Sequence, residues 1–287
     1  MNAHALVRSP RFVRWGIAVD RLPAGAWLAL QAVALLPAWS WMARRLADGS
    51  DDPLGLLAVA ALALLAVHHR RALRPSPALG WLALATLLTP AAALARPALP
   101  PLAASLLAVL ALACALLAFL PRRVAATPVL GLAVLALPLL SSLQFYAGYP
   151  LRVLTAEASR WLLAPFFTVW REGSTLLVDG RLVVVDAPCS GVQMAWLGYA
   201  TACAAALWSG LPDRAVLARL PFAGLAVLAG NVLRNSLLVA AEGAGRPLPA
   251  WAHEALGLVV LAAVCGAIAW RMQRPQTFNG DRHAQPA

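Results

Sequence analysis

The segment Asp186–Met194, with the sequence DAPCSGVQM, joins a strand-like segment to a long apolar run. The apolar run begins at Ser190, so Cys189 should lie in the first turn of a membrane-spanning helix. The positive end of a helix dipole favours a thiolate, and a helix start at the water interface is accessible from outside the membrane. A cysteine before a helix can also be purely structural. The remaining cysteines lie inside apolar runs and are interpreted as core or lipid-facing residues: Cys114, Cys203 and Cys265.

The composition is typical of a polytopic membrane protein. Hydrophobic residues make up 61% of the 287 residues and charged residues 12%, with a mean hydropathy of +0.73. The formal net charge is +11. It comes from arginines at the ends of apolar runs, where they set topology, so nucleic-acid binding is not indicated. The four cysteines have no paired spacing. We therefore expect no disulfide framework, no metal site and no cofactor.

Hydropathy predicts about eight membrane-spanning helices, each a run of roughly 17 to 25 apolar residues. The second run is the shortest of them. Prolines inside three runs predict kinks, at Pro37, Pro90 and Pro138. The runs cover residues 24–42, 53–67, 77–94, 101–120, 128–146, 190–208, 215–241 and 251–270.

The distribution of arginine predicts a cytoplasmic N-terminus, with Arg44 and Arg45 as the one clustered exception. Residues 147–188 then lie on the outer face. Within them we expect an amphipathic interfacial helix at 151–167, followed by a β-hairpin at 175–185 whose Asp179-Gly180 pair suits a type I′ turn.

The fold class predicted is thus an all-α membrane protein with a small outer hairpin. Residues 1–274 should form a single polytopic transmembrane domain. The polar residues 275–287, rich in Pro and Gln, should form a disordered cytoplasmic tail.

Polar residues interrupt the last two runs. Asn231 and Arg234 lie inside the seventh run, and His253 lies at the start of the eighth. An arginine inside a membrane span costs roughly 2.5 to 3.5 kcal/mol to insert. Arg234 could simply extend to the interface, and His253 could be an ordinary interface residue. Together with Cys189, however, both fall near the outer face on three successive spans. A thiol, an imidazole that relays a proton and a guanidinium that stabilises an oxyanion suit acyl transfer.

Three motifs resemble those of the exosortase/archaeosortase family: CSG at 189–191, NVLR at 231–234 and HEALG at 253–257. The upstream segment QFYAGYPLR at 144–152 is similar as well. The resemblance is strongest over residues 141–269, and the first four spans are matched only by hydropathy.

The resemblance implies an integral-membrane cysteine protease and transpeptidase in the bacterial inner membrane, with its active site facing the periplasm. Such enzymes cleave a C-terminal sorting signal of membrane-anchored protein substrates. The signal is a short motif of the Pro-Glu-Pro (PEP-CTERM) type followed by a transmembrane helix and a basic tail. In bacteria such proteins often accompany exopolysaccharide gene clusters.

Carried onto this sequence, the resemblance implies Cys189 as the nucleophile, Arg234 as the essential arginine and His253 as the third catalytic member. Asp186 and Pro188 depart from the family's commoner pattern, in which Ala precedes the cysteine, and this bears on the preferred signal. Supporting or substrate-binding positions are Arg152, Asn231, Ser190 and Gly191.

The alternative is a transporter or membrane scaffold for exopolysaccharide or lipid export, with Arg234 and His253 lining a pathway. A transporter of this kind is expected to show paired repeats with discontinuous helices in both halves. The notable intramembrane polar residues all lie in the second half of the sequence, which favours the enzyme. The identity of the substrate and of the acceptor nucleophile stays open.

Overall fold

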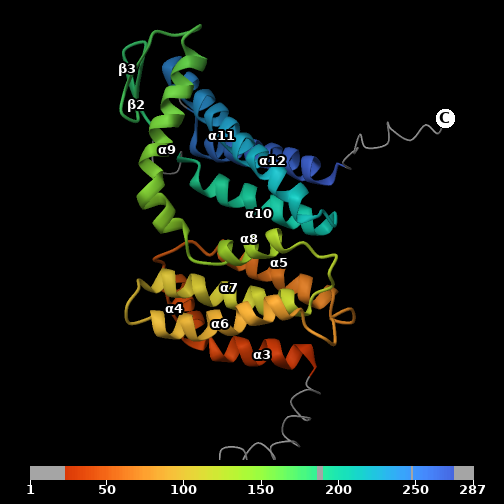
Figure 1. The fold of residues 1–287 in the computed structure, drawn as a ribbon. Coiled ribbons are helices and arrows are strands. Elements are labelled where there is room, and N and C mark those ends of the chain that lie inside the picture. Colours follow the sequence, from red (N-terminus) through yellow and green to blue (C-terminus); the bar gives the residue numbers. More distant parts are fainter. Residues whose placement is uncertain (1–22, 186–189, 247, 275–287) are drawn as a thin grey trace, which may run out of the picture. The chain divides into compact units, whose positions relative to one another are not determined.

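The computed structural model describes residues 23–185, 190–246 and 248–274 (Figure 1). The regular secondary structure of these residues is helical apart from one small sheet, which confirms the predicted class of an all-α membrane protein. The predicted tail, 275–287, lies outside the described residues. The chain divides into two compact units, one of residues 1–122 with 136–138 and one of residues 123–135 with 139–287.

The number of spans differs from the eight predicted. By length and composition, three described helices can each cross a membrane, or up to five spans form if each of two bent helix pairs counts as one. Two further apolar helices, α5 (Gly55–His68) and α6 (Leu79–Ala95), are shorter. Hydropathy measures the apolar content of a window, and it does not register where a helix breaks inside that window.

The first unit is built around α7 (Pro101–Phe119), whose alanines are buried against the neighbouring helices. Small side chains allow helices to approach closely in a membrane protein. The first predicted span, 24–42, is two helices, α3 (Ala24–Ala34) and α4 (Leu36–Ala47), bent by 66°. Pro37 lies in the first turn of α4, where its missing N–H removes no helical hydrogen bond.

The second unit begins with α8 (Ala126–Leu135) and α9 (Leu140–Leu163), which are bent by 93° relative to each other. The predicted span 128–146 is therefore interrupted, and the break includes Pro138. The predicted interfacial helix is the second part of α9, which starts earlier and contains Pro150. The prediction was correct for 151–163, but the helix begins eleven residues earlier and ends at Leu163, four residues before the predicted end.

Three helices complete the second unit: α10 (Val192–Trp208), α11 (Asp213–Gly243) and α12 (Ala250–Gln273). Two glycines bring them together. A Cβ at Gly198 would lie 2.5 Å from a methyl of Val227, and a Cβ at Gly230 would lie 2.3 Å from a methyl of Val264. These approaches place α10, α11 and α12 in direct contact around a shared apolar core.

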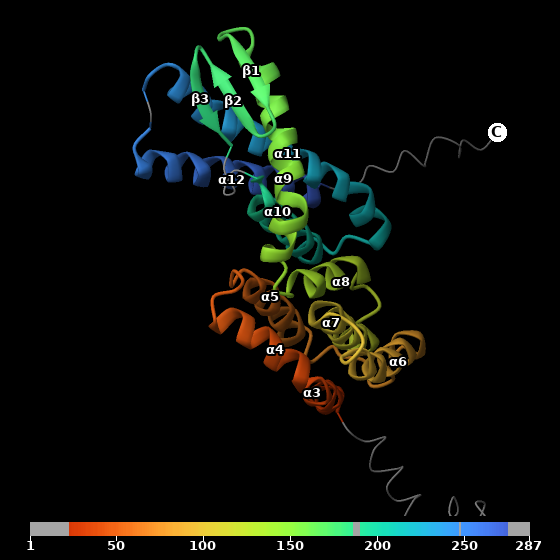
Figure 2. The same cartoon turned by 90° about the vertical axis from the view of Figure 1, so that its left-hand side faces the viewer.

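The sheet consists of β1 (Val169–Glu172), β2 (Thr175–Val178) and β3 (Arg181–Val184), antiparallel and in that order. Asp179 and Gly180 have φ values of 46° and 83°, which confirms the predicted hairpin and its turn with positive φ at both positions. The strand β1 was not predicted. The buried face of the sheet packs on α9 and α11, and Figure 2 shows the sheet beside the end of α9.

Two arginines cap the C-terminal ends of helices. Arg74 donates to the carbonyl oxygens of Leu117 and Ala118 at the end of α7, at 3.1 and 2.9 Å. The buried Arg219 donates to Arg271, Met272 and Arg274 at the end of α12, at 2.8 to 3.1 Å. The last carbonyls of a helix have no partner within the helix, and a cation there also interacts favourably with the helix dipole.

Candidate active site

The start of α10 is held in a conformation that requires glycine. Gly191 precedes the helix with a φ of 79°, in the left-handed region that L-residues rarely adopt. A Cβ at this position would lie 2.9 Å from Cγ of Asn231. Asn231 of α11 therefore packs directly on the Gly191 backbone, and no larger residue fits there unless the Asn231 side chain moves.

Ser190 attaches the start of α10 to α9. Its hydroxyl donates to Oε1 of Gln144 on α9 at 2.8 Å, and it accepts a longer bond from the backbone N–H of Val192 at 3.4 Å. Ser190 is buried. A Cβ at Gly148 would lie 2.8 Å from Nε2 of Gln144, so the Gln144 side chain lies flat over that glycine. Gln144 is thus oriented by its own helix toward Ser190.

Two amide–hydroxyl hydrogen bonds join α9 and α11. Asn231 Nδ2 donates to Thr155 Oγ1 at 3.0 Å, and Asn235 Nδ2 donates to Ser159 Oγ at 2.9 Å. All four side chains are buried. Both pairs are spaced by four residues on their helices and in the same order, so α9 and α11 run parallel here. We refer to these four residues as the polar ladder.

Arg234 lies at the contact between α11 and α12, against the face of α12 that also carries His253. Arg234 lies one turn after Asn231, and its guanidinium covers Gly257, where a Cβ would be 3.1 Å from Nε. His253 is four residues before Gly257 on α12, so the two lie on the same face of that helix. Both side chains are half-buried. The spacing places the imidazole one turn from the guanidinium, with Gly257 leaving room for it.

Arg152 belongs to the same face of α9 as the polar ladder. It is three residues before Thr155 and seven before Ser159, and it is half-buried. Its guanidinium lies 5.8 Å from the centroid of the Tyr149 ring, within the range of a cation–π contact. The structure therefore places Arg152 on the face of α9 that carries the polar ladder.

A carboxylate on another part of α9 connects the helix to the sheet. Glu157 accepts from Arg160 NH2 at 2.6 Å, from Arg171 Nε of β1 at 2.5 Å and from Trp161 Nε1 at 2.8 Å. Arg160 also donates from Nε at 3.2 Å, and these four hydrogen bonds satisfy the acceptor capacity of one carboxylate. This contact anchors β1 to α9 and so fixes where the sheet begins.

The structure brings together Ser190, Gly191 and Asn231, and it places Arg234 next to Gly257 on the helix of His253. Cys189, together with Asp186 and Pro188, lies outside the described residues. Of the other cysteines, Cys114 and Cys203 are buried and Cys265 is half-buried. Within the described ranges, no group of three His, Cys, Asp or Glu side chains is arranged to hold a metal ion.

Sequence reasoning did not assign a role to Gln144, Thr155, Ser159 or Asn235. The spacing offered one signal, because Thr155 with Ser159 and Asn231 with Asn235 are both pairs of polar residues four apart. Polar residues at that spacing lie on one helix face, and inside a membrane such a face needs a partner. The pairing of the two faces, 76 residues apart in sequence, required the structure.

The family model described as transmembrane exosortase matches residues 39–270. The matched range includes every residue of the candidate site. Searches of curated proteins and of solved structures returned no match.

Proposed function

The chain belongs to the transmembrane exosortase family, and from that premise we propose that it is a cysteine transpeptidase that cleaves C-terminal sorting signals through an acyl-enzyme on Cys189. Its substrates would be membrane-anchored proteins with a Pro-Glu-Pro type motif, a transmembrane helix and a basic tail. The enzyme would lie in the inner membrane with its site facing the periplasm.

The observation that supports this proposal most directly is the position of Asn231. Its side chain packs on Gly191, two residues after Cys189, and Arg234 follows one turn later on the same helix. Arg234 in turn covers Gly257, one turn from His253. The segment bonded to the proposed nucleophile and the helices of the two other catalytic residues therefore share one packed core.

In the proposed reaction, the Cys189 Sγ attacks the scissile carbonyl carbon and its proton passes to His253. The Arg234 guanidinium donates to the carbonyl oxygen as it becomes negative. His253 then gives the proton to the leaving amine as the C–N bond breaks, which leaves a thioester on Cys189. An acceptor nucleophile attacks the thioester, transfers its proton to His253 and restores the thiol.

Ser190 has a positioning role in this scheme. Cys189 is joined to Ser190 by one peptide bond, and the Ser190 hydroxyl is held by Gln144 at 2.8 Å. A catalytic group must be held to within a fraction of an ångström of its productive position. The hydrogen bond to α9 and the contact of Gly191 with α11 would supply that restraint.

The test is to trap the acyl-enzyme. The chain is co-expressed with a candidate substrate that carries an N-terminal tag, and membranes are treated with hydroxylamine, which attacks thioesters. We expect the wild type to release a substrate fragment ending in a hydroxamate, identified by its mass, and Cys189→Ala to release none. Cys265→Ser is the matched control and should process normally. Processing by Cys189→Ala at equal protein level would exclude Cys189 as the nucleophile.

A further inference from the structure

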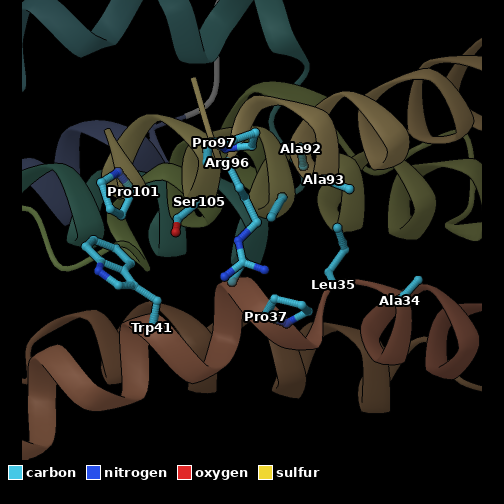
Figure 3. A pocket seen from close by; sticks show the side chains of 13 residues that line it. Ala34, Leu35, Pro37, Trp41, Ala92, Ala93, Arg96, Pro97, Pro101 and Ser105 are labelled. Atoms are coloured by element: carbon cyan, nitrogen blue, oxygen red, sulfur yellow. The ribbon is translucent and has the colours of Figure 1, made fainter. Parts of the chain in front are cut away.

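The first unit contains a cavity of about 490 Å³ (Figure 3). It lies between the break that separates α3 from α4, the end of α6 and the start of α7. The volume is within the range of small-molecule sites in proteins. The lining residues are small or apolar with few exceptions: Ala34, Leu35, Pro37, Ala38, Trp41, Ala92, Ala93, Arg96, Pro97, Pro101, Ala104, Ser105 and Ala108.

The cavity follows from the sequence of these three segments. The 66° bend at Leu35 turns α4 away from the line of α3, and prolines end one neighbouring helix and begin the next. The walls between them are alanines, including the buried Ala92, Ala104 and Ala108, which are too short to fill the space. The cavity is open to the surface, since Ala93, Arg96 and Pro97 are exposed, and in a membrane protein its apolar wall suits a hydrocarbon chain.

One charged side chain, the exposed Arg96, lies at the opening of this cavity. Figure 3 shows Arg96, the residue at the end of α6, extending toward Pro37 of α4. Within the described part of the chain, Arg96 makes no hydrogen bond and no ion pair, and no lining residue is acidic. Asp51, near the end of α4, is paired with Arg45. The charge of Arg96 therefore lacks a compensating anion from these residues.

The side chains that line the cavity indicate which kind of anion would pair with Arg96. A guanidinium presents several N–H donors in a plane that matches the oxygens of a phosphate. Trp41 lines the same cavity, and an indole is favoured at the level of lipid headgroups because it is apolar with one polar N–H. Ser105 adds a hydroxyl from α7. A phosphate next to a hydrocarbon-lined cavity is the chemistry of an anionic phospholipid.

We propose that this cavity binds one anionic phospholipid, with the phosphate at Arg96 and an acyl chain along the alanine wall of α6 and α7. The site is in the first unit and does not depend on the proposed catalytic function. The bend between α3 and α4 contributes to the site, since Leu35 and Pro37 at the bend line the cavity.

Native mass spectrometry of the purified full chain in detergent tests the proposal, with phosphatidylglycerol and phosphatidylcholine added separately. We expect the wild type to retain phosphatidylglycerol in preference to phosphatidylcholine. Arg96→Gln should lower phosphatidylglycerol retention about tenfold or more, the loss expected for a charge-assisted hydrogen bond. Arg122→Gln is the matched control, because Arg122 is exposed in the same unit but does not line the cavity, and it should behave as wild type.

A second variant tests the acyl chain independently of the charge. Ala93→Phe fills the cavity from an exposed lining position and should lower the retention of both lipids. Equal retention of phosphatidylglycerol by wild type and Arg96→Gln, or no effect of Ala93→Phe, would overturn the proposal. Glycerol 3-phosphate, added as a competitor, distinguishes the source of the phosphate. If it displaces the lipid at equal concentration, the site recognises a free phosphate ester and the lipid assignment is wrong.

Discussion

Arg234 is packed so closely on Gly257 that the shape of its side chain matters as much as its charge. The planar guanidinium lies across the glycine, with Nε 3.1 Å from the position of a Cβ. A lysine has a flexible stem and a compact ammonium, so it cannot reproduce a flat contact of this kind. This packing distinguishes a positioned arginine from one that only extends to the membrane interface.

We therefore predict that Arg234→Lys fails nearly as badly as Arg234→Ala. If the guanidinium stabilises the oxyanion, its loss should slow processing about a hundredfold, since one such donor contributes roughly 3 kcal/mol. The rate of substrate processing in membranes is the measurement, at protein levels matched by immunoblot. Near-normal processing by Arg234→Lys would contradict the catalytic assignment and leave Cys189 and His253 as a dyad.

Gly191 provides a second prediction for a single residue. Gly191→Ala should destabilise the start of α10, because positive φ costs an L-residue roughly 1 to 2 kcal/mol and the new methyl collides with Asn231. Combining it with Asn231→Ala should relieve the collision but not the backbone strain. A double-mutant cycle on thermal unfolding in detergent checks this. Strictly additive effects would show that the two residues do not contact each other.

At the scale of elements, the polar ladder fixes the register of α9 on α11. Hydrogen bonds between membrane helices contribute about 0.6 kcal/mol on average and at most roughly 2. The two bonds therefore add little stability, but each donor and acceptor would be costly to leave unpaired in an apolar interface. A shift of either helix by one residue would break both bonds at once.

The two bonds of the polar ladder should differ in their effect on activity. Thr155→Val removes the acceptor of Asn231, which also contacts Gly191, whereas Ser159→Ala removes the acceptor of Asn235 one turn away. We expect similar small losses of stability, about 1 kcal/mol each, but a clear fall in processing only for Thr155→Val. Thermal unfolding and processing are measured on the same preparations. A larger activity loss in Ser159→Ala would be evidence against the role of Asn231 in positioning Gly191.

At the scale of the whole molecule, the arginine distribution predicts which segments face outward. In a chain without its native cysteines, Glu172→Cys should react with an impermeant thiol reagent from outside. Arg123→Cys should react only after lysis, because the Arg122-Arg123 pair is expected on the cytoplasmic side. Both positions are exposed in the structure. The opposite labelling pattern would move the proposed active site to the cytoplasmic face.

The features that could be read from the sequence are those with a local signature. Asp179-Gly180 specifies its turn within two residues, and the apolar runs identify membrane helices wherever they occur. The helix breaks at Leu35 and at 136–139 were not predicted. Pro37 and Pro138 were interpreted as kinks within continuous helices, because a kink and a break have the same local sequence. The strand β1 was missed although Gly173-Ser174 separates it from β2 and Gly173 has a φ of 57°.

In the candidate site, too, some residues could be predicted from local sequence and others could not. Arg234 and His253 were selected because polar residues are conspicuous in apolar runs, and Cys189 because it precedes a run whereas the other cysteines lie inside runs. The residues that position them were not, because Gln144 and Thr155 become informative only when α9 is placed against α10 and α11. Long-range pairing of this kind depends on the tertiary fold, which local patterns do not encode.

The capping of α7 and α12 by Arg74 and Arg219 affects how the orientation of the chain can be tested by mutation. Both arginines lie in segments that the arginine distribution predicts to be cytoplasmic, and both also donate to the terminal carbonyls of a helix. Their removal would therefore mix a topogenic effect with unravelling of a helix end. Arg122 and Arg214, which are exposed and have no such bonds among the described residues, are the positions where charge can be altered to examine insertion alone.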